Sequence, residues 1–193
     1  MFPRGNRDLD NVKWVHHDRV GYIFPEPASV NLSNRAQQGK WSDISAAKSA
    51  SDEPVTHDVF LLGMDHGNSS ASASYQYIVV PGVAPEEVAR TSENNRTIEI
   101  LANTPDLQGV LHHGLGLCQL AFYKAGEVDL SDGCTIKMDS QGMAMLKMEG
   151  DRIVEVSVSD PSRMLTRIVL TVPGRYKPVG DNVNALENAE WNT

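Results

Sequence analysis

The sequence has little cysteine and lacks the long apolar runs that mark membrane-spanning helices. Its 193 residues include only Cys118 and Cys134, which allow at most one disulfide and exclude a cysteine-stapled scaffold. This count leaves the redox compartment open. The longest apolar stretches, such as Val59–Met64, are far shorter than the roughly 20 residues of a transmembrane helix. The first residues also lack the apolar region of a signal peptide, so we expect neither a bilayer span nor a visible secretion signal.

Positive charge is also scarce. Seventeen Lys and Arg residues stand against 25 Asp and Glu residues, which gives a formal net charge of −8. A surface of this sign repels polyanions, so we do not expect nucleic acid as a partner. The apolar fraction of 40% and the charged fraction of 22% are typical of globular proteins and exclude disordered, collagen-like and coiled-coil classes. The length fits one domain or two modest ones.

The sequence does contain a regular succession of short β-type segments. Residues that are β-branched or aromatic recur about every ten positions between Gly, Pro, Asn, Asp and Ser, which predicts an all-β fold. In Arg152–Val158, we expect Val154, Val156 and Val158 to share one face, opposite Ile153. So many strands favour a sandwich over a single small sheet. The expected strands are Val12–His17, Val20–Phe24, Val55–Met64, Ser74–Val80, Thr97–Leu101, Leu107–His112, Leu117–Tyr123, Cys134–Met138, Met143–Met148, Arg152–Val158 and Leu165–Val172.

Only Ala84–Arg90 has helical character, with Pro85 and two acidic residues in its first turn. Because strands and helices do not alternate, a Rossmann-type sheet and its dinucleotide chemistry are excluded. We expect Asn34–Glu53 to be a long polar loop or a weak edge region, and Pro81–Asn95 to connect two domains. The tail Lys177–Thr193 has little apolar content, and we expect it to be frayed or cut short.

Six histidines invite a metal or catalytic interpretation. Four of them form doublets in strand-like segments, where adjacent side chains point to opposite faces, so only one of each pair can join a given site. The spacing contains no HxH, HExxH or zinc-finger pattern. We therefore favour ordinary hydrogen-bonded strand histidines over a metal site that draws on distant strands. The histidines are His16, His17, His57, His66, His112 and His113.

Two short motifs could carry chemistry, and we favour a turn for each. Asp65 and His66 could orient a general base, but a turn in which Asp65 binds backbone amides and Gly67 takes a positive φ also explains them. No GxSxG elbow supplies a nucleophile, and neither cysteine has an activating flank. Gly114-Leu115-Gly116 lacks the third glycine, the helix and the lysine of a phosphate-binding loop, so it predicts a tight hairpin or a bulge.

Aromatic residues could form a platform on which sugar rings stack. The candidates are Trp14, Trp41, Tyr75 and Tyr77, because a flat aromatic face matches the C–H face of a pyranose. For Trp14 and for one of the tyrosines, packing in the core is the favoured role.

Several stretches follow one another in a characteristic order. The first group comprises Trp14–Pro25, Trp41–Ile44, Val59–Gly67 and Tyr75–Gly82, and the second comprises Ile98–Leu101, Gln108–Val110, Ala121–Gly126 and Val156–Ser162. In this order they resemble the central and C-terminal β-domains of polysaccharide lyase family eight, which includes hyaluronate, chondroitin AC and xanthan lyases. The resemblance covers about residues 12–176 and rests on the order of the motifs, since no single motif decides it.

The resemblance implies an all-β fold with two parts. Residues 1–83 would form an antiparallel β-sandwich that is the C-terminal portion of the central super-sandwich domain. Residues 84–97 would be a linker with a short helix. Residues 98–193 would form a smaller C-terminal β-sandwich, truncated at its end.

The resemblance also implies where the chemistry lies. Lyases of this family cleave uronic-acid polysaccharides by β-elimination: a base removes the C5 proton, the carboxylate is neutralised, and the C4–O bond breaks. In the family, the Asn, His, Tyr and Arg that do this lie on an N-terminal α/α toroid, and an assisting Glu comes from the early central domain. Neither region corresponds to this chain. We therefore assign no catalytic, cofactor-binding or metal-binding residue, and we expect the chain alone to be inactive.

The leading hypothesis is thus a non-catalytic β-sandwich portion that supports a missing helical catalytic domain. Its partners would be that domain and, through the parent enzyme, an acidic polysaccharide, and the resemblance implies a secreted or periplasmic location. The alternatives are a free-standing carbohydrate-binding or scaffolding module and a small metal-dependent enzyme built on the histidine doublets. The identity of the polymer, the oligomeric state, the pairing of Cys118 with Cys134, and whether this is a natural short protein or a fragment stay open.

Overall fold

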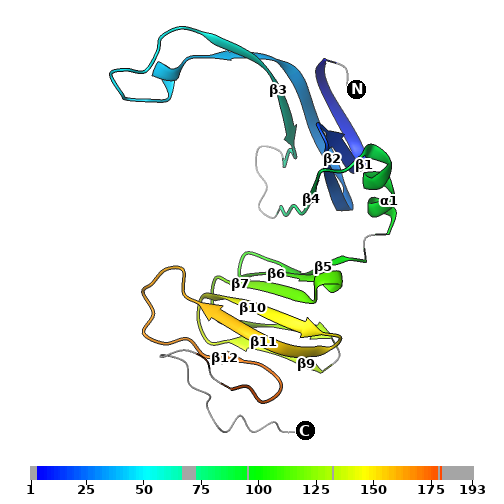
Figure 1. Cartoon of the computed structure of the whole chain (residues 1–193), viewed down its shortest axis with the longest axis vertical. Helices are drawn as coiled ribbons and strands as arrows, with labels where there is room; N and C mark the ends of the chain where they lie inside the picture. Colours follow the sequence, from blue (N-terminus) through cyan, green and yellow to red (C-terminus); the bar gives the residue numbers. More distant parts are fainter. Residues whose placement is uncertain (1–3, 67–72, 95, 132, 178, 180–193) are drawn as a thin grey trace. The chain divides into compact units, whose positions relative to one another are not determined.

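The computed structural model describes residues 4–66, 73–94, 96–131, 133–177 and 179 (Figure 1). The chain divides into two compact units, Met1–Asn95 and Arg96–Thr193. The paired strands in both units are antiparallel. Among the described helices, none is long and apolar enough to cross a membrane.

The first unit contains a four-stranded sheet in the order β1–β2–β3, with β4 also paired to β2. The turn between β1 and β2 is formed by Asp18 and Arg19, whose φ angles of 45° and 63° are those of a type I′ hairpin. The register of this long hairpin shifts on either side of Val12, by one residue between Leu9 and Val12, as in a bulge, and by a larger irregularity between Val12 and Trp14. The strands are β1 (Gly5–His17), β2 (Val20–Gly39), β3 (Val55–Gly63) and β4 (Ile78–Pro81).

Helix α1 (Pro85–Glu93) packs on one face of this sheet. Its Val88 is 1% exposed and forms a cluster with Val83 and the fully buried Ile23 of β2. Gly21 permits the close approach, because a Cβ at this position would lie 2.5 Å from the Val88 side chain. Trp14 packs against the same cluster, which confirms its predicted role in the core.

The second unit is a sandwich of two sheets. The larger sheet has the order β11–β10–β7–β6–β5 and the smaller one β12–β9–β8. Cys118, Leu120 and Leu146 of the larger sheet share one core with Ile136 and Met138 of the smaller sheet. The predicted sandwich is therefore confirmed. Its strands are β5 (Ile98–Asn103), β6 (Leu107–His112), β7 (Leu117–Phe122), β8 (Gly126–Ser131), β9 (Cys134–Met138), β10 (Gly142–Glu149), β11 (Arg152–Ser159) and β12 (Leu170–Thr171).

Several strand assignments differ from the sequence-based expectation. Strand β1 begins at Gly5 rather than at Val12, and only parts of the expected Ser74–Val80 and Leu165–Val172 form strands, β4 and β12. The loop interpretation of Asn34–Glu53 is wrong for Asn34–Gly39, which continues β2 and pairs with β3 through backbone hydrogen bonds despite its polar side chains. Strand β8 was not expected, because acidic residues alternate with its buried Val128 and Leu130 and lower its apparent β propensity.

A bulge also changes the predicted faces of β11. Lys147 pairs with Glu155 and Met148 with Ile153, so Val154 is an extra residue on the bulged strand. The bulge reverses the alternation at this point. Ile153 is buried in the sandwich core, and Val156 packs against the same core, whereas a regular strand would place them on opposite faces. The expectation that Ile153 faces away from Val156 is therefore wrong.

Candidate functional site

The first histidine doublet is used in structural contacts on two sides of β1. The Nε2–H of His16 donates to the carbonyl oxygen of Val83, at 3.0 Å. The ring of His17 stacks on Phe60, with centroids 4.0 Å apart and planes at 3°. The two rings have separate partners, as strand alternation predicts, and each side chain is fixed by packing or hydrogen bonding.

The second doublet belongs to the connection between β6 and β7. Nδ1 of His112 accepts a hydrogen bond from the backbone N–H of Leu115 at 3.1 Å, and Nε2 of His113 lies 2.8 Å from the Glu99 carboxylate. Gly116 ends this turn in the left-handed conformation, with φ at 57°. The glycine pair thus makes a tight hairpin, as predicted. Across the described ranges, no three His, Cys, Asp or Glu side chains form a group that could hold a metal ion.

The cysteines lie on opposite sheets of the sandwich, Cys118 on β7 and Cys134 on β9, and both are free thiols. Burial, and secondarily the proximity of Cys134, raises the pKa of Cys118 to about 12. Burial, and secondarily the charge of Asp129, also raises the pKa of Cys134. Because the thiolate is the reactive form, neither environment activates a nucleophile at neutral pH.

The structure brings together the side chains of three candidate residues from the connection between β3 and β4. They lie on either side of residues 67–72, which are outside the described part of the chain. The Tyr75 and Tyr77 rings are near-parallel, with centroids 6.4 Å apart and planes at 18°. The His66 ring lies 6.0 Å from Tyr75. Trp41, by contrast, lies on a short 3₁₀ turn at Trp41–Asp43. The turn expected at Gly67 lies outside the described residues.

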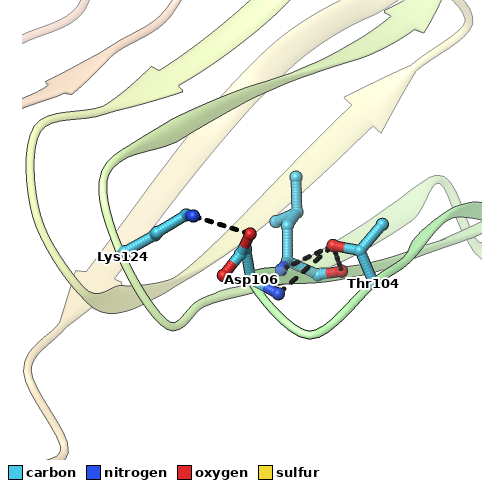
Figure 2. Close-up of polar contacts among 4 residues, drawn as sticks. Thr104, Asp106 and Lys124 are labelled. Atoms are coloured by element: carbon cyan, nitrogen blue, oxygen red, sulfur yellow. Dashed lines mark hydrogen bonds and ion pairs between the residues drawn. The ribbon is translucent and has the colours of Figure 1, made fainter. Parts of the chain in front are cut away.

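One further hollow, which was not anticipated, lies in the second unit beside the hairpin of β6 and β7. It has a volume of about 450 Å³, and its lining includes Thr104, Asp106, Lys124 and Glu127. Figure 2 shows the ammonium of Lys124 beside the carboxylate of Asp106, at 2.7 Å. The Thr104 hydroxyl accepts hydrogen bonds from the backbone N–H of Leu107 at 3.0 Å and of Asp106 at 3.3 Å.

The register of the hairpin explains this arrangement. Leu107 pairs with Phe122, so the residues just before β6 and just after β7 meet at one end of the sheet. Had this pairing been assumed, the sequence alone would have placed Asp106 beside Lys124. The lining residue Glu127 is itself paired with Lys137 at 2.7 Å. The charged groups that line the hollow thus form local ion pairs, and Thr104 stabilises a turn. Among Thr104, Asp106, Lys124 and Glu127, no acid or base is without a partner.

Comparison with known proteins relates both units to one family. Residues 2–92 match the super-sandwich domain of polysaccharide lyase family 8, and residues 99–169 match the C-terminal beta-sandwich domain of that family. A chondroitinase-AC of Pedobacter heparinus is 36% identical over 161 residues, which are 82% of this chain and 22% of that protein. A hyaluronate lyase of Thermasporomyces composti is 32% identical over 154 residues, or 79% of this chain and 19% of that protein.

Solved structures agree with the sequence comparison. A chondroitinase AC lyase superposes with a TM-score of 0.77 at 34% identity, covering 89% of this chain and 25% of that one. A xanthan lyase of Paenibacillus gives a TM-score of 0.72 at 25% identity, covering 82% of this chain and 16% of that one. The chain thus spans about a fifth of the length of these relatives. With both of its units matched in order, the chain belongs to polysaccharide lyase family 8.

Proposed function

We propose that this chain is the non-catalytic β-sandwich portion of a lyase that cleaves uronic-acid polysaccharides by β-elimination. The observation that carries the proposal is the match of both units, in order, to the super-sandwich and C-terminal domains of the family. In this proposal, residues 1–83 are the end of the central domain, 84–97 are the linker, and 98–193 are the C-terminal domain. The polymer would be of the hyaluronan, chondroitin or xanthan type, after the names of the relatives.

The proposed division of labour follows from the chemistry that β-elimination requires. A base must reach the C5 proton, and cationic or hydrogen-bonding groups must neutralise the adjacent carboxylate. In this chain, His16 bonds a backbone carbonyl, His17 stacks on Phe60, and His113 pairs with a carboxylate. The net charge of −8 also opposes a uronate. We infer that the base and the cationic groups belong to a helical domain that this β portion supports.

The proposal extends to the partner and the compartment. The helical catalytic domain would be the main partner, and the polysaccharide would be met through the assembled enzyme. Long polysaccharides of this kind are found outside the cytoplasm, so we propose that the parent enzyme is secreted or periplasmic.

The test is an absorbance assay for the unsaturated uronate product, with hyaluronan, chondroitin sulfate and xanthan as substrates. The purified 193-residue chain should give no rise in absorbance, while the Pedobacter heparinus chondroitinase-AC serves as the positive control on chondroitin sulfate. A steady rise that scales with the concentration of this chain, and that survives repeated purification, would contradict the proposed supporting role.

A further inference from the structure

The two cysteines of the second unit lie on strands of facing sheets. Cys118, on β7, is fully buried in the core cluster of the sandwich, and Cys134, the first residue of β9, packs against the same cluster. Both are free thiols in the structure. Whether the two side chains can meet depends on the direction of the two strands and on their register across the core.

One end of the two strands is fixed by close contacts. Gly126 pairs with Met138, the last residue of β9, and a Cβ on this glycine would lie 3.8 Å from the ring of Phe122, the last residue of β7. Gly142 pairs with Phe122, and a Cβ there would lie 2.9 Å from Sδ of Met138. The last residues of β7 and β9 are therefore neighbours across the core.

The other end of the two strands is linked through Tyr176. The backbone N–H of Met148 donates to the carbonyl oxygen of Gly116, which directly precedes β7, and Met148 pairs with Ile153. The Tyr176 hydroxyl lies 3.3 Å from the carbonyl oxygen of Ile153. Burial, and secondarily the charge of Cys134, raises the pKa of this hydroxyl. Strand β9 therefore begins at the same end of the sandwich as β7, and the two strands run in the same direction.

The spacing along the strands aligns the two cysteines. Cys118 lies four residues before Phe122, and Cys134 lies four residues before Met138. An even spacing keeps side chains on one face of a strand, so each cysteine points into the core with the residue that ends its strand. The equal spacing also carries both cysteines the same distance from the shared end, about 13 Å at the usual rise per residue. Cys118 and Cys134 are therefore opposite each other.

A single free cysteine is an ordinary small core residue, but a facing pair can also be cross-linked. In immunoglobulin domains a disulfide joins strands of the two facing sheets, so the spacing of a β-sandwich is compatible with such a bond. We propose that Cys118 and Cys134 form a modification site, in which a disulfide ties β7 to β9 when the second unit folds in an oxidising medium.

Disulfide exchange with oxidised glutathione supplies the oxidation. The thiolate of Cys134, the more accessible of the two, attacks one sulfur of oxidised glutathione and releases a glutathione thiolate. The thiolate of Cys118 then attacks the Cys134 sulfur of this mixed disulfide and releases the second glutathione. The protein loses two protons and two electrons, and one glutathione disulfide becomes two thiols. Because burial raises the pKa of both cysteines in the folded unit, we expect the exchange to take place before the core closes.

The test is to refold the reduced chain from urea in a buffer rich in oxidised glutathione and then to alkylate the remaining thiols. Trypsin cleaves after Lys124 and separates the cysteines into peptides 97–124 and 125–137. We expect a monomer that is lighter than the reduced chain by two hydrogen atoms, with these two peptides linked. Chain secreted into the bacterial periplasm is analysed in parallel, so that the result does not depend on the refolding yield.

The bond should also stabilise the second unit. The linked chain should have a thermal midpoint at least about 5 °C above that of the same sample reduced with dithiothreitol, because the closed loop restricts the unfolded state. Cys134→Ala is the matched control, since it keeps a small apolar side chain and cannot form the bond. Its thermal midpoint should not change when dithiothreitol is added.

Three results would overturn the inference. In the first, the refolded and the periplasmic chains keep both thiols free. In the second, the cysteines are linked only to glutathione or to a second copy of the chain. In the third, the internally linked chain melts at or below the temperature of the reduced chain. None of these measurements involves a polysaccharide or a helical domain, so their outcome is independent of the proposed function.

Discussion

Replacement of Gly116 by alanine should destabilise the second unit. Gly116 has φ at 57°, in the left-handed region, where a residue with a Cβ costs roughly 1–2 kcal/mol. A Cβ at this position would also lie 2.2 Å from the carbonyl oxygen of Met148, which is a backbone atom and cannot rotate away. The strands must therefore separate at this point. The backbone hydrogen bond from Met148 N–H to Gly116 O, at 2.7 Å, would weaken at a further cost of about 1 kcal/mol.

The combined cost is about 2–3 kcal/mol, which corresponds to a change of about 30- to 150-fold in the unfolding equilibrium. Amide hydrogen exchange read by mass spectrometry resolves the two units. Peptides from β6, β7 and β10 should exchange faster by this factor when their exchange proceeds through global opening of the unit. Peptides from β1 and β2 should exchange at the wild-type rate, because they belong to the other unit.

Gly114 supplies the matched control in the same turn. A Cβ there would lie 3.4 Å from Cε1 of the His112 side chain, an ordinary van der Waals contact. Gly114→Ala should therefore change exchange in β6, β7 and β10 by less than about threefold, or under ~1 kcal/mol. The reasoning is refuted if Gly116→Ala exchanges like the wild type, or if the two alanine variants slow or speed exchange equally.

Three further predictions follow from the packing and protonation of the second unit. Ile153→Ala should lower the unfolding free energy of the second unit by about 2–4 kcal/mol, and Val154→Ala should lower it by less than about 1 kcal/mol, measured by urea denaturation. Equal losses of unfolding free energy in the two variants would contradict the bulge at Val154. Hydrogen bonds from the Ser162 hydroxyl and from the Leu165 backbone lower the pKa of Asp160. The ionised Asp160 carboxylate therefore stabilises the fold above the unfolded pKa of about 3.9, and this stabilisation is lost as the pH falls through the folded pKa. The thermal midpoint of the wild type should thus fall more steeply between pH 5 and pH 2.5 than that of Asp160→Asn, and parallel curves would contradict this. Because burial raises the pKa of Cys118 to about 12, its thiol should react with Ellman's reagent at pH 8 only after unfolding in urea, and rapid reaction in the native state would contradict the buried placement.

The strands were predictable where burial and β propensity agree. Leu107–His112 was expected and is found with the same bounds, because buried positions alternate along it between two turn signals. Strand β8 escaped notice because the signal lies only in the alternation of Val128 and Leu130 with acidic residues. The polar end of β2, at Asn34–Gly39, shows no apolar alternation in the sequence. It is a strand because its backbone pairs with β3. Propensity and patterning do not report this kind of pairing.

Side-chain neighbourhoods were less predictable than strands. The expectation that one of the two tyrosines packs in the core is wrong, since Tyr75 and Tyr77 are both more than half exposed. Nothing in the sequence showed that the His66 ring would lie beside Tyr75. The contact between Asp106 and Lys124 depends on the register of the hairpin of β6 and β7. The bulge at Val154 likewise depends on the partner strand, because one extra residue changes the face of every residue beyond it.

The central claim is that this chain is the β portion of a longer lyase. The most direct measurement is the size of its native gene product, detected with antibodies raised against the chain in the cells and the medium of the source organism. The account predicts a product several times longer than 193 residues, located outside the cytoplasm, whose preceding sequence is in frame and helical. A native product of 193 residues with no longer form would contradict it.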